Sequence, residues 1–231
     1  MKRIVLMVTM IISSLTCAVW AETKNEATTD RLDKSAEVLK QIMAAPDQGI
    51  PEEVIEHAKC IAVVPHMIKG GFVVGAEGGR GVASCRTAAG HWSAPAFFAV
   101  AGGSWGLQIG VEGVDLVMVV QNDQGMQHLL SSKFKLGADA SAAAGPVGRH
   151  ASADTDWKMN AEILTYSRAK GVFAGLTLTG AVVQRDDDSM RTVYGSEVAT
   201  RSVLSGAVPV PPEAHAFLSA IRTARTEAAS R

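Results

Sequence analysis

The feature that most constrains this fold is a series of short, β-prone segments separated by glycine between residues 61 and 120. Glycine readily adopts the positive φ angles of tight turns, and the chain contains 22 glycines. Short strands joined by such turns predict an antiparallel meander. The expected strands are Ile61–Val64, Phe72–Ala76, Val82–Thr87, Phe97–Ala101, Trp105–Val111 and Asp115–Val120, and the expected turns are Lys69–Gly71, Gly78–Gly81, Ala89–Gly90, Gly102–Gly103 and Glu112–Gly113.

An amphipathic helix is expected before this region, from Asp30 to Ala45. Its apolar residues recur at three- and four-residue steps, Asp30 can cap its start, and Pro46 ends it. Further expected elements are helices over Glu52–Lys59, Gly125–Ser132 and Glu213–Thr226, β segments over Phe173–Gln184 and Thr192–Tyr194, and a solvated turn over Asp186–Asp188. The predicted fold class is therefore α+β: a mainly antiparallel curved sheet or barrel-like meander with an N-terminal amphipathic helix and a few short helices.

The first residues predict a secretory signal peptide. Lys2 and Arg3 are followed by an apolar stretch, and Val19 and Ala21 fit a cut after Ala21. The apolar stretch is shorter than the roughly 20 residues of a spanning helix, although an uncleaved anchor is an alternative. A lipoprotein processed at Cys17 is another alternative, but Ser14 and Thr16 match that signal poorly.

Export sets the expected domain organisation and location. Residues 1–21 form the signal peptide, 22–29 a flexible N-terminus, 30–226 one domain, and 227–231 a tail. We expect the mature chain in the periplasm or associated with the envelope. Loss of Lys2 and Arg3 lowers the 22 basic residues to 20, against 23 acidic ones, a net charge of −3. This balance argues against a nucleic-acid-binding protein.

Two cysteines, Cys60 and Cys85, remain after the predicted cleavage. Outside the cytoplasm such a pair tends to form a disulfide, and the alternative is two buried free thiols. In a meander, the strands that carry these cysteines approach only if the sheet curls or if the first strand pairs elsewhere. The disulfide prediction therefore constrains the topology as well as the redox state.

The sequence contains no motif that indicates an enzyme, a metal site or a cofactor. The glycines of Gly75–Gly81 do not fit G-x-G-x-x-G and precede a predicted strand, whereas a dinucleotide site needs a helix there. There is no P-loop, no G-x-S-x-G and no H-E-x-x-H, and the six histidines are scattered. A catalytic site assembled only in space, as in a hydrolase, stays an alternative.

Several cations are candidates for binding anionic head groups. Lys69 and Arg80 lie beside glycines, where backbone N–H groups and a cation together suit a phosphate. Two more lie on the predicted N-terminal helix, and three flank or end the Ala- and Gly-rich segment after residue 132. These are Lys34, Lys40, Lys133, Lys135 and Arg149. Ordinary solvated charges are the alternative explanation for each of them.

An ordered set of short motifs resembles the SYLF lipid-binding domain family, here as an exported bacterial member. The match as a whole spans about residues 31–221, and the ordered set of motifs within it is more specific than any one of them. They are Ala58–Pro65, Lys69–Phe72, Gly79–Val82, His91–Phe97, Gly106–Gly110, Leu136–Ser141, Gly145–Arg149, Tyr166–Gly175 and Tyr194–Gly195.

The resemblance implies a non-enzymatic domain that binds phospholipid or phosphoinositide-type head groups at a membrane surface. In this setting the N-terminal helix lies either on a bilayer, with Lys34 and Lys40 near the head groups, or on the protein's own sheet. Some members of the family bind actin filaments, but an exported protein would not meet cytoplasmic actin. An envelope module that binds a protein partner without lipid is the alternative function.

Overall fold

The computed structural model describes residues 24–45, 49–146, 161–169, 172–175, 178, 180–195 and 198–229. An N-terminal helix covers residues 24–44. The remaining elements are α2 (Glu52–Glu56), β1 (Cys60–Cys85), β2 (Ala96–Val120), α3 (Asp123–Leu130), β3 (Lys133–Lys135), β4 (Ala142–Ala144), β5 (Ile163–Ala169), β6 (Val172–Gly175), β7 (Val182–Arg185), α4 (Asp187–Tyr194), α5 (Thr200–Leu204), η1 (Pro212–Ala214) and α6 (His215–Ala229). The predicted signal peptide, the Cys17 alternative and Arg149 lie outside the described residues.

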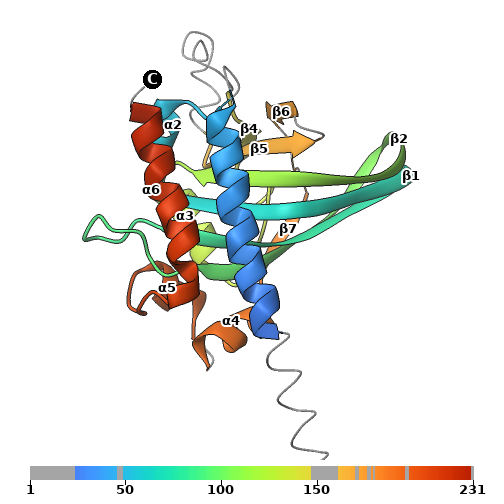
Figure 1. Cartoon of the computed structure of the whole chain (residues 1–231). Coiled ribbons are helices and arrows are strands. Elements are labelled where there is room, and N and C mark those ends of the chain that lie inside the picture. Colours follow the sequence, from blue (N-terminus) through green and yellow to red (C-terminus); the bar gives the residue numbers. More distant parts are fainter. Residues whose placement is uncertain are drawn as a thin grey trace, which may run out of the picture.

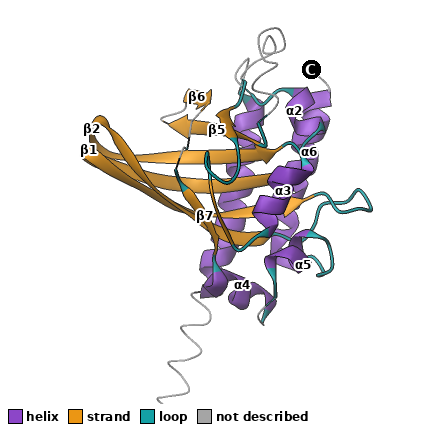
Figure 2. Ribbon diagram, turned by 180° about the vertical axis from the view of Figure 1, so that it is seen from behind, coloured by secondary structure: helices purple, strands orange, loops and turns teal. Residues whose placement is uncertain are grey.

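The predicted α+β class with a curved, mainly antiparallel sheet and an N-terminal helix is confirmed. The described strands form one seven-stranded sheet in which β4 and β5 are the parallel pair. Two helices, the N-terminal helix and α6, cross one face of the sheet side by side (Figure 1). The view from behind shows the curl of the sheet and its long β1–β2 ribbon (Figure 2).

The predicted series of short strands is wrong in one respect: β1 and β2 are two long continuous strands. They pair antiparallel from Cys60 opposite Val120 to Ala83 opposite Ala96. Among the described glycines of the five expected turns, only Gly90 has a positive φ, at 81°. Most of those glycines therefore lie inside strands, where backbone pairing overrides their turn preference.

Both long strands fold back on themselves, and this produces the curl. β1 runs away from the helices, bends, and returns beside its own first half, while β2 follows it (Figures 1 and 2). The first half of β2 then pairs with β7 and the second half with β5. We call the part of this ribbon at residues 68–78 of β1 and 101–113 of β2 the ribbon bend, and the opposite end its base.

The core lies between the sheet and the helices. On the N-terminal helix Leu32 and Leu39 are fully buried, as is Phe217 on α6. Each such side chain contributes about 1.5–3 kcal/mol relative to exposure. The amphipathic pattern was therefore correctly interpreted as a helix, and its apolar face packs on the protein's own sheet, although the helix begins at residue 24 rather than at Asp30.

Three other local predictions are corrected by the structure. The expected strand Phe173–Gln184 is two short strands, β6 and β7, and the expected strand at Thr192–Tyr194 belongs to helix α4. Asp186 is not in a solvated turn but is buried, and its side chain caps α4 by accepting a hydrogen bond from the Ser189 N–H. A carboxylate at a helix start is favoured because it satisfies a free N–H and the helix dipole.

Candidate functional site

The base of the ribbon is closed by a disulfide between Cys60 and Cys85. Their Sγ atoms are 2.04 Å apart and their Cα atoms 3.9 Å apart, and both residues are fully buried. The backbone N–H of Arg86 also donates a hydrogen bond of 2.8 Å to the carbonyl of Lys59. The two ends of β1 therefore meet, because the sheet curls as the predicted pairing requires.

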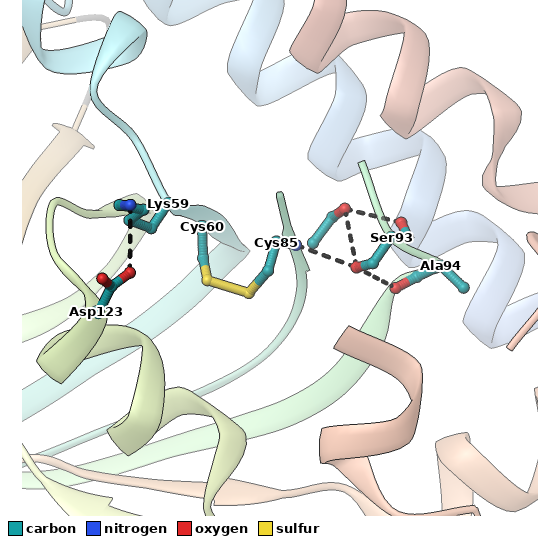
Figure 3. The surroundings of a disulfide bond; sticks show 7 residues. Lys59, Cys60, Cys85, Ser93, Ala94 and Asp123 are labelled. Carbon is teal, nitrogen blue, oxygen red and sulfur yellow. Dashed lines mark hydrogen bonds and ion pairs between the residues drawn. A yellow bond between two sulfur atoms is a disulfide. The ribbon is translucent and has the colours of Figure 1, made fainter. Parts of the chain in front are cut away.

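Residues after the disulfide hold this base in a hydrogen-bond network (Figure 3). The Ser93 hydroxyl accepts from the Cys85 N–H at 3.1 Å and donates to the Ala94 carbonyl at 2.9 Å. On the other side, the Lys59 ammonium lies 3.2 Å from the Asp123 carboxylate. The base is thus fixed by covalent, backbone and side-chain contacts together.

Two glycines let the halves of β1 pack against each other. A Cβ at Gly79 would lie 2.6 Å from a Val64 methyl group. A Cβ at Gly81 would lie 2.7 Å from the Phe98 ring and 2.8 Å from a Val64 methyl group. Both distances are below ordinary contact, so these glycines are required for close approach and not for turning the chain.

Lys69, a predicted head-group ligand, is used inside the protein. Its ammonium lies 3.2 Å from the Glu77 carboxylate, and the two side chains are 19% and 7% exposed. Since both residues belong to β1, one on each side of the bend, the ion pair ties the two halves of the strand together. Little of the Lys69 charge is left for an external anion.

Arg80, the second candidate beside glycines, lies at the edge of a buried ionic cluster. Its Nε is 3.8 Å from the Asp186 carboxylate, while its side chain is 63% exposed. The same carboxylate binds Arg31 of the N-terminal helix at 3.0 Å and accepts a hydrogen bond of 2.8 Å from the Ser189 hydroxyl. The Arg31 guanidinium also lies 5.5 Å from the centre of the Phe97 ring.

Burial and pairing set the charge state of this cluster. Burial lowers the pKa of Arg31, although Asp186 raises it in part. Burial alone would raise the pKa of Asp186, but the hydrogen bonds from Ser189 and Arg31 outweigh it, so the net pKa is below the ordinary value. The cluster is therefore a charged pair that attaches the N-terminal helix to α4 over the sheet.

The sequence prediction missed this pair because it placed Asp186 in a solvated turn and gave Arg31 no role. A weak signal was present: Asp186 precedes Ser189 by three residues, the spacing of a helix cap. No signal in the sequence pairs Arg31 with a residue 155 positions away. Only the packing of the helix on the sheet brings them together.

The remaining candidate cations are exposed and lie apart from this cluster. Lys34 pairs with Asp30 at 2.7 Å on the outer side of the N-terminal helix, and Lys40 is exposed on the same helix. Lys133 and Lys135 are exposed on β3, with the buried Phe134 between them. The candidates that the structure describes therefore lie on three elements: the N-terminal helix, β1 and β3.

The ribbon bend has a composition unlike the rest of the surface. No charged residue occurs between Gly70 and Ala76 of β1 or between Ala101 and Val111 of β2. At its margin Ile68 is 51% exposed, which is unusual for so large an apolar side chain. Both views show the bend extending from the body on the side away from α2 and α6 (Figures 1 and 2).

Within the described part of the chain, no group of three or more His, Cys, Asp or Glu residues is arranged to hold a metal ion. A hollow near Phe97, Leu129 and Thr200 has a volume of about 10 Å³, comparable to one water molecule. None of the helices that the structure describes has the length and apolar character needed to span a bilayer.

Comparison with known proteins identifies relatives over most of the chain. Residues 101–224 match the Ysc84 family, described as "Las17-binding protein actin regulator". SH3 domain-containing YSC84-like protein 1 of Homo sapiens is 32% identical over 187 residues, 78% of this chain and 54% of the relative. Protein YSC84 of Saccharomyces cerevisiae is 34% identical over 194 residues, 80% of this chain and 41% of the relative.

A third relative, LAS seventeen-binding protein 3 of Saccharomyces cerevisiae, is 32% identical over 169 residues, 72% of this chain and 37% of the relative. The chain spans about half the length, or less, of the curated relatives it matches. The similarity therefore concerns the domain described above, and the activities of the complete relatives do not follow from it.

Proposed function

Because the chain belongs to the Ysc84 (SYLF) domain family, we propose that it is a non-enzymatic domain that binds lipid at a membrane surface. The observation that carries the proposal is the ribbon bend, a glycine-rich end of the sheet that projects from the body and has no charged residue over residues 70–76 and 101–111. An extended surface without charge suits a bilayer better than a soluble ligand. We also propose that the protein acts after export, in the periplasm or at the envelope.

The N-terminal helix does not supply this surface in the resting fold. Its residues Leu32 and Leu39 are already buried, and Arg31 is held by Asp186. Transfer of the helix to a bilayer would keep its apolar residues covered but would break the buried ion pair and expose the sheet. The exposed Lys40, Lys133 and Lys135 can add attraction to anionic lipid of about 1 kcal/mol each.

Vesicle flotation of the mature chain tests the proposal. We expect the protein to float with vesicles of phosphatidylcholine, phosphatidylglycerol or phosphoinositide-containing mixtures, and binding to none of these contradicts it. A charge-reversed variant, Lys133→Glu/Lys135→Glu, separates the electrostatic contribution, because its loss of binding is confined to anionic vesicles at low salt.

A protein-binding module is the second candidate function. The family description and the name of one relative both refer to binding of a protein, Las17. For this chain we propose an envelope protein partner rather than an actin regulator. A pull-down that survives detergent, with no flotation of the free protein, would favour this second function over lipid binding.

A further inference from the structure

A proline-rich segment, Val208-Pro209-Val210-Pro211-Pro212, joins α5 to η1 and α6. We call these five residues the proline segment. The proline ring fixes φ near −65°, and a residue that precedes proline is restricted to extended conformations, so the sequence itself favours a polyproline II helix here. The dihedral angles of Pro211, φ −72° and ψ 149°, agree with this conformation. Pro212 also begins η1, and its ring continues the polyproline path because φ is nearly the same in both conformations.

The exposure of the proline segment repeats every three residues, which is the period of a polyproline II helix. Val208 and Pro211 are half-buried, and Val208 packs against the core. Pro209 and Pro212, also three residues apart, are exposed. Val210 lies on the third edge, is 37% exposed, and is one of two large apolar side chains exposed in the described part of the chain. One edge of the helix therefore holds the segment on the body, while the other two face outward.

The backbone of the proline segment has unused hydrogen-bonding capacity. In the part of the chain that the structure describes, no hydrogen bond involves the Val210 N–H or the carbonyl groups of residues 208–210. A polyproline II helix makes no internal hydrogen bonds, so these carbonyls stay available as acceptors for an incoming partner.

Both ends of the proline segment are fixed to the body. Before it, Gly206 has a φ of +87° and packs so closely on Thr87 that a Cβ there would lie 2.5 Å from a Thr87 methyl group. At its other end, the Ala214 N–H donates a hydrogen bond of 3.0 Å to the Pro211 carbonyl. A segment that is already held in its bound conformation loses little entropy on binding.

The charges around the proline segment restrict what can bind it. Residues 202–212 carry no charge, and the nearest charged residues along the chain are Arg201 and Glu213. A groove with an acidic pocket beside the prolines would repel Glu213, which directly follows Pro212. The hydrocarbon of a bilayer is disfavoured as well, because it cannot satisfy the free carbonyl groups.

Taking these observations together, we propose that the proline segment is the docking site of a protein domain whose aromatic-lined, neutral or basic groove takes the rings of Pro209 and Pro212. Aromatic-lined grooves recognise preformed polyproline II helices, in which these rings lie one turn apart. The inference is independent of lipid binding and rests on the second candidate function, for which it names the surface. The two helices that the segment joins, α5 and α6, lie on the side of the body away from the ribbon bend (Figures 1 and 2), so a partner and a membrane can be bound together.

The test places a photoreactive residue in the full mature chain, in the cells that produce it. Val210→p-benzoylphenylalanine should cross-link to one protein that Thr223→p-benzoylphenylalanine, at an exposed position of α6, does not capture. Because capture alone does not show how the protein binds, the captured protein is then purified and titrated into isotope-labelled mature chain. The amide resonance of Val210, the backbone N–H that lies between those of Val208 and Glu213, should shift on binding.

Two variants separate the exposed edges of the proline segment from the half-buried one. Pro209→Ala/Pro212→Ala removes both outward-facing rings and should weaken binding of the captured protein by at least about tenfold. Pro211→Ala removes a half-buried ring and only loosens the segment, so it should weaken binding by no more than about threefold. Both variants should keep the wild-type resonances outside the segment and should float with vesicles as wild type does.

Three results overturn the inference. One is a cross-link at Val210 that is no stronger than at Thr223, and another is equal binding of the captured protein to wild type and to Pro209→Ala/Pro212→Ala. A cross-link only to a second copy of the chain would show that self-association covers the segment. Lipid binding is measured separately by flotation and does not fail with the inference. A pull-down partner that makes no contact at Val210 would support the protein-binding function but contradict this surface.

Discussion

The two ends of the β1–β2 ribbon consist of the same two strands but are stabilised in different ways. At the base, Cys60, Val63 and Cys85 are fully buried, and a disulfide joins the ends of β1. At the bend, helices no longer cover the ribbon, and Ile68 is half exposed. The contrast shows that the disulfide and these fully buried side chains stabilise the ribbon at its base rather than at its bend.

Glycine shows the same contrast. At Gly81, near the base, a side chain would collide with Phe98 and Val64, so the residue is required by packing. At Gly78, the last β1 residue of the ribbon bend, a Cβ would meet only the Val100 carbonyl at 3.7 Å, an ordinary contact. One residue type thus fulfils two roles in one strand, and substitutions can separate them.

The largest expected effect concerns the buried ion pair over the base. Asp186→Ala should lower the free energy of unfolding by about 4 kcal/mol, because it leaves the Arg31 charge buried without its partner. Asp188→Ala, at an exposed position of the same helix, should cost less than about 1 kcal/mol. Urea unfolding of both variants measures the difference, and equal losses would show that the pair has no special role.

The same pair predicts an acid dependence. The pKa of Asp186 is lower in the fold than in the unfolded chain. Its contribution to stability is therefore complete above the unfolded pKa of about 4 and is lost as the pH falls through the folded pKa. Asp186→Ala should show a weaker decline of stability below about pH 4 than wild type, in urea unfolding followed by circular dichroism.

The next prediction concerns removal of the disulfide at the base of the ribbon. Cys60→Ser/Cys85→Ser should lower the free energy of unfolding by about 3 kcal/mol, because the 25-residue separation is no longer closed in the unfolded chain. Chemical denaturation with and without a reducing agent measures it, and wild type under reduction should resemble the variant. Thiol labelling of denatured wild type purified under oxidising conditions should find neither cysteine free; two reactive thiols there would refute the disulfide.

The third prediction compares the two glycine roles. Gly81→Ala should cost about 2 kcal/mol through overpacking between the halves of β1. Gly78→Ala, three residues earlier, should change stability by less than about 0.5 kcal/mol. Thermal or chemical unfolding of the two variants measures the difference in stability. A larger loss for Gly78→Ala than for Gly81→Ala would mean that the two halves of β1 are not in close contact.

The smallest expected effect on stability concerns the bend. Ile68→Thr should change the free energy of unfolding by less than about 0.5 kcal/mol, because the Ile68 side chain is 51% exposed and threonine keeps the β-branch that suits a strand. It should nevertheless weaken vesicle binding, because we propose that the ribbon bend contacts lipid. A stability loss of several kcal/mol would place Ile68 in the core and would remove the distinction between the two ends.

Most of the predictions that the structure confirms were based on the spacing of apolar residues along the sequence. The three- and four-residue spacing of Leu32, Ala36 and Leu39 predicts the N-terminal helix, and these residues are buried. The predicted strands Ile61–Val64 and Asp115–Val120 lie within β1 and β2. What failed was the interpretation of glycine, since Gly78–Gly81 suits a turn and a strand equally well until its partner strand is known.

The candidate cations also could not be interpreted from their sequence neighbours alone. Lys69 and Arg80 were selected because they neighbour glycines, yet the structure places each near a carboxylate, Glu77 and Asp186 respectively. Their partners are eight and 106 residues away in sequence, and the second lies on an element predicted as a solvated turn. Sequence identifies a charge but not the charge that faces it.

The sequence by itself determined the α+β class, the family, the N-terminal helix and the possibility of a disulfide, because these depend on local periodicity, ordered motifs and residue type. The tertiary structure decided that β1 and β2 are continuous, that Cys60 meets Cys85, and that Arg31 is buried against Asp186. These facts depend on the fold-back of the ribbon. A fold-back is set by contacts between residues distant in the chain, which compete with and override local turn preferences.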